Sequence, residues 1–138
     1  MTDAKTLLVQ NWLTKAQHDL ESARVLAANE RPLLDTAIYH CQQSAEKAVK
    51  GFLVHCDEPI ERVHDIEVLI RSAMRHTPEF ADWIEVGIQL TPYARIYRYP
   101  GFAIEPTASQ FNQALAAADG LYQFVLSLLP EAYQPTSK

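Results

Sequence analysis

The sequence contains few of the residues that build several common functional sites. Its 138 residues include only four glycines, and neither Gly-x4-Gly-Lys-Ser/Thr nor Gly-x-Gly-x2-Gly occurs. A glycine-rich loop around a phosphate group is therefore excluded. The Gly-x-Ser-x-Gly elbow of hydrolases is missing too, as are His-x3-His, His-Glu-x2-His and Cys-x2-Cys spacings. Because these patterns mark common nucleophile and zinc sites, we expect no metal and no cofactor.

Cysteine is also scarce, since the chain has only Cys41 and Cys56. If both belong to one helix, the 15 positions between them correspond to roughly 22 Å at a rise of 1.5 Å per residue. The Cα atoms of a disulfide must lie within about 7 Å of each other. The two cysteines therefore cannot bridge each other, and we interpret them as buried thiols in a reducing compartment.

Long apolar runs are absent, and acidic residues outnumber basic ones. No stretch approaches the ~18 consecutive apolar residues of a membrane span, and the first residues do not have the pattern of a signal peptide. We therefore expect a soluble cytoplasmic protein. The formal net charge of −5 argues against a protein that coats nucleic acid in general, but not against a local basic cleft.

The sequence does contain apolar residues at three- and four-residue steps, the spacing of an amphipathic helix. This spacing predicts helices over about residues 5–28 and 33–56, and Pro32 and Pro59 interrupt the pattern after them. No segment alternates polar and apolar residues as a strand does. We therefore expect an all-α fold, an up-and-down antiparallel bundle of four to five helices in a single domain.

Capping residues mark the starts of three further helices. Asp65 precedes the first, Thr77 precedes the second, and Thr107 with Gln110 matches a capping box before the last, which Pro130 ends. The helical core is expected to span about residues 5–129, with a frayed tail over 130–138. Side chains expected to be largely buried are Trp12, Leu20, Ala45, Phe52, Leu115 and Val125.

The second predicted helix has two different faces. We expect its compact apolar face to pack closely inside the fold and its polar face to be presented to something polar. Lys47 and Lys50 on the polar face are candidates to face a phosphate, although lysines at helical spacing are usually solvated. The apolar face carries Ile38, Cys41, Ala45, Ala48 and Phe52, and the polar face carries Gln43, Glu46, Lys47 and Lys50.

Residues 91–106 contain three prolines, three tyrosines and two arginines without helical periodicity, and we expect an ordered loop. Within it, Arg95, Arg98 and Tyr99 are the strongest candidates for a binding site. A guanidinium group fits phosphate oxygens, and a tyrosine ring can stack on a base. The alternative is that the tyrosines pin the loop to the core and the arginines pair with acids such as Glu21 or Glu46.

His64 and Asp65 are adjacent at a predicted helix start. A carboxylate beside an imidazole can orient it for proton transfer. The alternative is that Asp65 only caps the helix and His64 is a polar neighbour. Both interpretations remain open from the sequence, because adjacent side chains rarely point at one ligand.

Four segments together resemble the HEPN domain family. They are Trp12, Ala16, Asp19, Leu20 and Ala23 in the first predicted helix, Tyr39-x2-Gln42-Gln43-x-Ala45-Glu46-Lys47-x2-Lys50 in the second, His64-Asp65-Ile66, and Tyr97-Arg98-Tyr99-Pro100. The resemblance spans about residues 8–128. It implies a helical bundle that forms a homodimer and pairs with a minimal nucleotidyltransferase, in some cases as a toxin–antitoxin pair. Ala114, Ala117 and Ala118 are candidates for a close helix contact in such a dimer.

Active HEPN toxins are metal-independent endoribonucleases whose signature is an arginine followed four to six residues later by a histidine. In the family the signature lies near the start of the last long helix. This chain departs from it, because no histidine follows His76. The run from Arg71 to His76 has the right spacing, but it lies at the end of the third predicted helix. We therefore favour a nucleotide- or RNA-binding module, with Arg95, Arg98, Tyr99, Lys47, Lys50 and His64 facing the ligand. The alternatives are a ribonuclease that uses Arg98 and His64, and a purely structural helical subunit.

Overall fold

The computed structural model describes residues 3–59, 62–101 and 104–135, and every regular element in them is helical. This confirms the predicted all-α fold. The α-helices are α1 (Ala4–Ala28), α2 (Leu34–His55), α3 (Ile66–Met74), α4 (Ile84–Leu90) and α5 (Ala108–Leu128), and the 3-10 helices are η1 (Pro78–Trp83), η2 (Thr91–Ala94) and η3 (Glu131–Tyr133).

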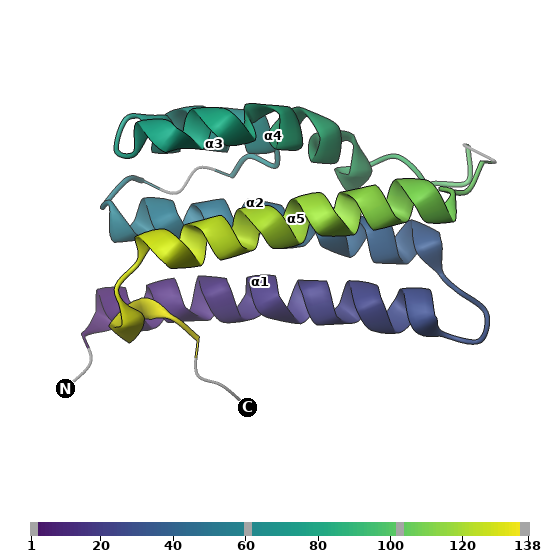
Figure 1. Cartoon of the computed structure of the whole chain (residues 1–138), viewed down its shortest axis with the longest axis horizontal. Coiled ribbons are helices and arrows are strands. Elements are labelled where there is room, and N and C mark those ends of the chain that lie inside the picture. The colour runs from purple at the N-terminus through teal and green to yellow at the C-terminus, as the bar shows by residue number, and fades with distance from the viewer. Residues whose placement is uncertain (1–2, 60–61, 102–103, 136–138) are drawn as a thin grey trace.

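The helices form three layers, which Figure 1 shows from the side. α1 makes one outer layer, α2 and α5 lie side by side in the middle, and α3 with α4 makes the other outer layer. α2 is central, since it contacts α1, α5, α3, α4 and η2. For this reason α2 is buried around most of its circumference, and its polar residues must find partners inside the protein.

Helix starts follow the capping chemistry of the sequence at two of the three predicted sites. The Asp65 carboxylate accepts a hydrogen bond from the Val68 backbone N–H, and both bonds of the Thr107–Gln110 capping box form. Thr77 is different, because its side chain makes no capping bond and the chain enters the 3-10 helix η1 before α4 begins. Residues 91–106 also begin with a helical turn, η2, where we had expected only a loop.

In the first turns of α1 the fully buried positions do not include Trp12. Val9 and Leu13 are fully buried, while Leu8 is exposed and Trp12 is half-buried. Leu115 of α5 is half-buried as well, so the prediction of deep burial was wrong for Trp12 and Leu115. It is confirmed for the other four side chains, which are Leu20, Ala45, Phe52 and Val125.

The expected polar face of α2 is largely inside the protein. The Glu46 carboxylate accepts from the Lys50 ammonium at 2.9 Å and from the Gln42 amide at 3.0 Å, and all three residues are buried. The neighbouring residue Lys47 donates to Asp19 of α1 at 2.7 Å. Glu46 and Lys50 therefore do not lie on an open surface, because the helices α1, α3 and α5 all pack against α2.

The alanine face of α5 packs against the core of the protein itself. Ala114 and Ala118 are fully buried, and Ala117 is half-buried against the same core, so these alanines do not form a free surface for a second copy. The homodimer stays a prediction, and a dimer contact would have to use a surface other than these alanines. The predicted tail is partly ordered as η3, where Tyr133 packs edge-on to the His55 ring at 4.8 Å. Residues 136–138 lie outside the described part.

Both cysteines are free. Cys41 is buried inside α2, and loss of solvent raises the pKa of its thiol to about 12. A thiol with so high a pKa is almost entirely protonated at neutral pH, which makes it a poor nucleophile. In the described residues no helix has the length and apolar character needed to cross a membrane.

We predict that Gly87→Ala destabilises the protein. A Cβ atom at this position of α4 would lie 3.0 Å from the Glu67 backbone nitrogen and 3.2 Å from its Cα, so two helix backbones would have to separate. Overpacking costs about 1–3 kcal/mol, which outweighs a helix-propensity gain of up to ~1 kcal/mol. Urea denaturation should show the loss. Gly101→Ala is the matched control, because nothing lies within 4 Å of its Cβ position.

We also predict that Lys50→Met lowers the free energy of unfolding by about 3 kcal/mol, since it leaves the buried Glu46 carboxylate without its cation. The double variant Glu46→Leu/Lys50→Met removes both charges and should recover most of that loss. Lys15→Met, at an exposed position of α1, is the control. Equal stability of the single variant and the control would show that the buried ion pair does not stabilise the fold.

Candidate functional site

Two segments that are far apart in the sequence meet at the N-terminal half of α2. Residues 62–65, just before α3, and residues 91–99, around η2, lie against this half of α2 and leave a cleft of about 250 Å³. We call this hollow the arginine cleft. Its lining residues are Tyr39, Gln43, His64, Ala94, Arg95, Arg98 and Tyr99. Four of the six predicted ligand-facing residues are therefore brought together, namely His64, Arg95, Arg98 and Tyr99.

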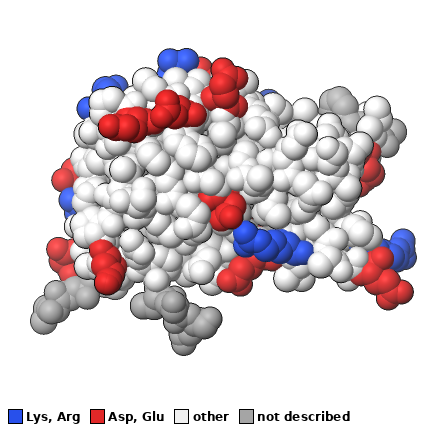
Figure 2. Space-filling view, viewed as in Figure 1, with Lys and Arg blue, Asp and Glu red and all other residues white. Residues whose placement is uncertain are grey.

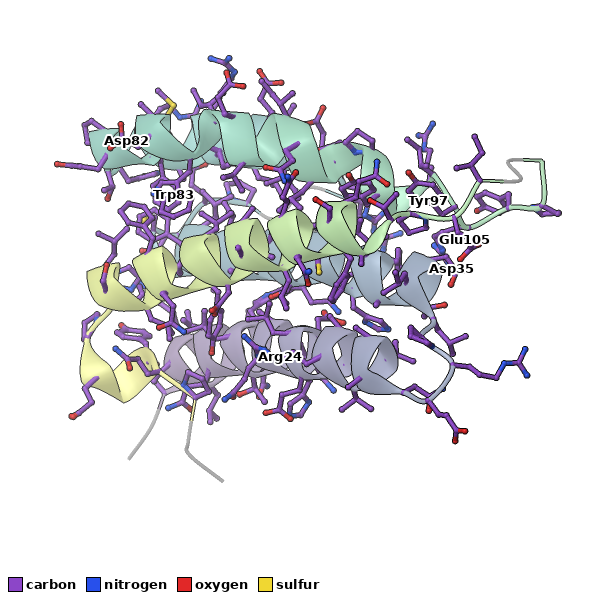
Figure 3. The ribbon with its side chains drawn as sticks, turned by 45° about the vertical axis from the view of Figure 1, so that its right-hand side comes forward. Arg24, Asp35, Asp82, Trp83, Tyr97 and Glu105 are labelled. Atoms are coloured by element: carbon purple, nitrogen blue, oxygen red, sulfur yellow. The ribbon has the colours of Figure 1, made fainter. Side chains whose placement is uncertain are left out.

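Two further hollows adjoin the arginine cleft. One shares His64, Ala94 and Arg95 with it and continues to Arg62 and Asp65. The other shares Tyr39 and Arg98 and continues to residues that include Asp35, His40 and Tyr97. Figure 3 labels Asp35 and Tyr97, which lie at the same end of the molecule. The first of these hollows lies between the segment before α3 and η2, and the second lies at the start of α2.

Arg98 is held by an aromatic ring. Its guanidinium carbon lies 4.0 Å from the centroid of the Tyr39 ring, a cation–π distance. Neither Arg98 nor Arg95 forms an ion pair with a carboxylate of the described residues, so the alternative pairing with Glu21 or Glu46 is not observed. Both arginines are exposed at the cleft, where their N–H donors can reach a ligand.

The backbone of this segment is unusual at Tyr97. Its φ of 72° lies in the left-handed region, which a bulky side chain adopts only at a cost of about 1–3 kcal/mol. The Tyr97 ring stacks on Tyr93 with the ring centroids 6.1 Å apart, and it is half-buried against the core. This packing holds the turn, so that Arg98 and the 61% exposed Tyr99 follow it directly at the cleft.

His64 is anchored by a carboxylate that sequence reasoning did not identify. Its Nδ1 atom lies 3.1 Å from Oε1 and 3.2 Å from Oε2 of Glu46, and the Gln42 amide donates to the His64 carbonyl at 3.2 Å. Asp65 caps α3 instead of orienting the imidazole. The His64 side chain is 71% exposed, while that of Glu46 is 5% exposed. No sequence pattern indicates this pair, because the two residues are 18 positions apart.

The two predicted lysines have other partners and do not line the cleft. Lys50 is buried against Glu46, with the Trp12 ring 5.7 Å away. Lys47 is bonded to Asp19, which also contacts His40 Nδ1 at 2.7 Å. The structure therefore corrects the grouping of Lys47 and Lys50 with the arginines. Tyr39 and Gln43 take their places, and both belong to the polar helix motif on which the resemblance rests.

The cleft differs in charge from the rest of the protein. No carboxylate occurs among the described residues that line it, although the chain has a net charge of −5. On the face drawn in Figure 2, by contrast, acidic and basic side chains are interspersed. Asp65 and Asp35 line only the two adjoining hollows. The arrangement favours an anion that is small enough to contact both arginines.

The described residues contain neither a candidate metal site nor a second arginine–histidine site. No group of three His, Cys, Asp or Glu side chains could hold a metal ion among them. The Arg71–His76 run does not form a site either, because Arg71 pairs with Glu67 and His76 contacts Glu58. These two side chains are occupied outside the arginine cleft.

Comparison with solved structures finds two similar proteins. TT1696 from Thermus thermophilus is 27% identical with a TM-score of 0.73, over 88% of this chain and 98% of that one. ST0689, described as an archaeal HEPN homologue, is 26% identical with a TM-score of 0.67, over 87% of this chain and 96% of that one. Among curated protein sequences, no significant match is found.

The family model of the HEPN domain matches residues 9–128, which run from the first turns of α1 to the last residue of α5. The match includes every residue that lines the arginine cleft. The all-helical architecture and the likeness to an archaeal HEPN homologue agree with it. The chain therefore belongs to the HEPN domain family.

Proposed function

We propose that this HEPN domain is a binding module for a phosphate-bearing ligand, a nucleotide or RNA, and that the arginine cleft is the binding site. One observation carries the proposal. Arg95 and Arg98 line a single cleft in which none of the described lining residues is a carboxylate, in a protein that is acidic as a whole. Two guanidinium groups without a carboxylate partner are an incomplete charge pair that a phosphate completes.

The residues around the arginines suit the same ligand. The Tyr39 ring under Arg98 limits the motion of the guanidinium group, which lowers the entropy lost on binding. Tyr99 presents an exposed ring on which a base can stack. The adjoining hollows give the rest of a nucleotide or a short RNA segment space on either side of the arginine cleft.

We propose in addition that the chain forms a homodimer and works with a minimal nucleotidyltransferase, as a toxin–antitoxin-like pair. The support is the family membership, since the described surface does not identify the partner. Co-expression with a nucleotidyltransferase encoded beside the gene, followed by affinity purification and light scattering, tests both associations. A lone 15.6 kDa species in that experiment would contradict them.

A second candidate function, metal-independent RNA cleavage, is favoured by the placement of His64. Its anchored imidazole lies in the same cleft as Arg98, so a proton-transfer group and a phosphate-binding group are adjacent. The histidine of the ribonuclease signature is nevertheless missing after Arg98. We therefore rank binding above cleavage.

The binding proposal predicts that Arg95→Ala/Arg98→Ala weakens binding strongly. Each charge-assisted contact is worth ~1.5–3 kcal/mol, so the loss should be on the order of 100-fold or more. Fluorescence anisotropy with a labelled single-stranded RNA, and competition by a nucleoside triphosphate, measures it. The salt dependence of the RNA affinity should also decrease, by about 1.4 in the slope of log K against log salt for two lost phosphate contacts.

The matched control is Arg71→Ala/Arg75→Ala, which removes the same charge from arginines paired with Glu67 and Glu58. We expect its affinity to stay close to that of the wild type. Equal weakening in both double variants would mean that net charge, and not the cleft, attracts the ligand. Earlier melting of the Arg95/Arg98 variant without any detectable ligand would support a purely structural role.

We predict that the wild-type protein does not cleave RNA in the presence of a metal chelator. The reason is the missing signature histidine, which leaves His64 as the only histidine among the described lining residues of the cleft. A labelled RNA incubated with highly purified protein checks this on a denaturing gel. Chelator-resistant cleavage that disappears in both His64→Ala and Arg98→Ala would establish the second candidate instead.

A further inference from the structure

The surroundings of His64 combine a buried carboxylate with an open cleft. On one side of the imidazole, Nδ1 lies within 3.1–3.2 Å of both Glu46 oxygens. The other side belongs to the lining of the arginine cleft, and the side chain is 71% exposed. A buried carboxylate is an acceptor only, so the atom that contacts it must carry a proton.

We propose that Glu46 is a positioning residue that makes His64 a proton-dependent phosphate ligand of the arginine cleft. With the Nδ1 proton committed to Glu46, only Nε2 remains for a ligand. Neutral Nε2 can only accept a hydrogen bond, while protonated Nε2 donates one to an anionic oxygen. The inference rests on the proposed phosphate binding and adds that binding takes up a proton.

The charges around His64 determine whether the affinity for phosphate rises or falls with pH. An anion bound between Arg95 and Arg98 adds a negative charge close to His64, and this charge attracts the imidazolium but not the neutral ring. The Glu46 carboxylate that contacts Nδ1 is also paired with the Lys50 ammonium. Asp65 and Arg62 face the adjoining hollow, with opposite charges. Bound phosphate therefore shifts His64 toward the imidazolium, and by linkage the affinity decreases as pH rises through the range in which imidazoles titrate.

Other contacts of Glu46 keep the carboxylate in place. Lys50 and Gln42 each donate to it, so its oxygens are fixed without any contribution from His64. The Gln42 amide also holds the His64 carbonyl, which fixes the backbone from which the imidazole extends. The imidazole is thus oriented before a ligand arrives, a condition for a hydrogen bond that costs little entropy.

The test uses an oligouridylate without terminal phosphates, because neither its phosphodiesters nor its bases titrate appreciably between pH 5.5 and pH 8. We expect the wild type to bind it about 10-fold more tightly at pH 5.5 than at pH 8, as for one added charge-assisted hydrogen bond. His64→Ala, at an exposed side chain, should remove this pH dependence. His18→Ala, at an exposed position of α1, should retain it.

The tautomer of His64 gives a second readout that needs no ligand. Nitrogen-15 NMR of the neutral imidazole should show the proton on Nδ1 in the wild type. In Glu46→Leu/Lys50→Met, which removes the carboxylate without leaving a buried charge unpaired, the proton should move to Nε2, its usual position in free histidine. The pH dependence of binding should disappear in the same variant.

The outcomes separate this inference from the proposed function. Binding that needs Arg95 and Arg98 but is equally tight at both pH values would overturn the role of His64 and leave the proposed function intact. An Nε2–H tautomer in the wild type would overturn the positioning by Glu46. Absence of binding at either pH would overturn the proposed function, and this inference with it.

Discussion

The buried carboxylate of Glu46 is the interaction on which the arrangement of the cleft depends. It lies on the central helix and accepts hydrogen bonds from Lys50 and Gln42, while its other contact reaches His64 in the segment before α3. An ionised carboxylate inside a protein is costly unless several donors satisfy it. Here the donors come from two parts of the chain, so satisfying the charge also fixes where residues 62–65 meet α2. The fold and the site therefore share one constraint.

A second carboxylate, that of Asp19, connects α2 to α1 on the other side of the molecule. Asp19 of α1 contacts Lys47 and His40 of α2, and the Ser44 hydroxyl of α2 donates to the Ala16 carbonyl of α1, so the α1–α2 interface combines polar pairings with apolar packing. Buried polar pairs specify which residues face each other better than apolar contacts do, because a shifted register leaves a charge unpaired. Most of the other buried residues of α2 are apolar, and apolar contacts allow close approach without specifying position. The two carboxylates supply that specification.

The elements were predictable from the sequence because they depend on local chemistry. Periodicity located the long helices, and the side chains of Asp65 and Thr107 marked helix starts that the structure confirms. The burial of polar side chains of α2 was not predictable from periodicity or capping residues. Glu46 and Lys50 look like surface residues on a helical wheel, but they are buried because α2 packs against helices on several sides. The partial exposure of Trp12 was not predictable either, because its ring lies near the Lys50 ammonium, 5.7 Å from its nitrogen, and not in the core.

The site was predictable only in part, for the same reason. An unusual composition around Arg95, Arg98 and Tyr99 was enough to select that segment, whereas the carboxylate that orients His64 comes from a distant helix and leaves no sequence signal. The structure adds a distinction that composition could not make between the arginines of this chain. Arg24, Arg71 and Arg75 each form an ion pair with a carboxylate, and within the described residues Arg31, Arg62, Arg95 and Arg98 do not. Of these four, Arg95 and Arg98 line the arginine cleft. In a protein with a net charge of −5, an anionic ligand is repelled at long range, so its affinity must come from short-range contacts with such unpaired donors. The proposed binding function would then be selective for an anion that reaches both guanidinium groups, because an anion that cannot reach them gains nothing from the surrounding field.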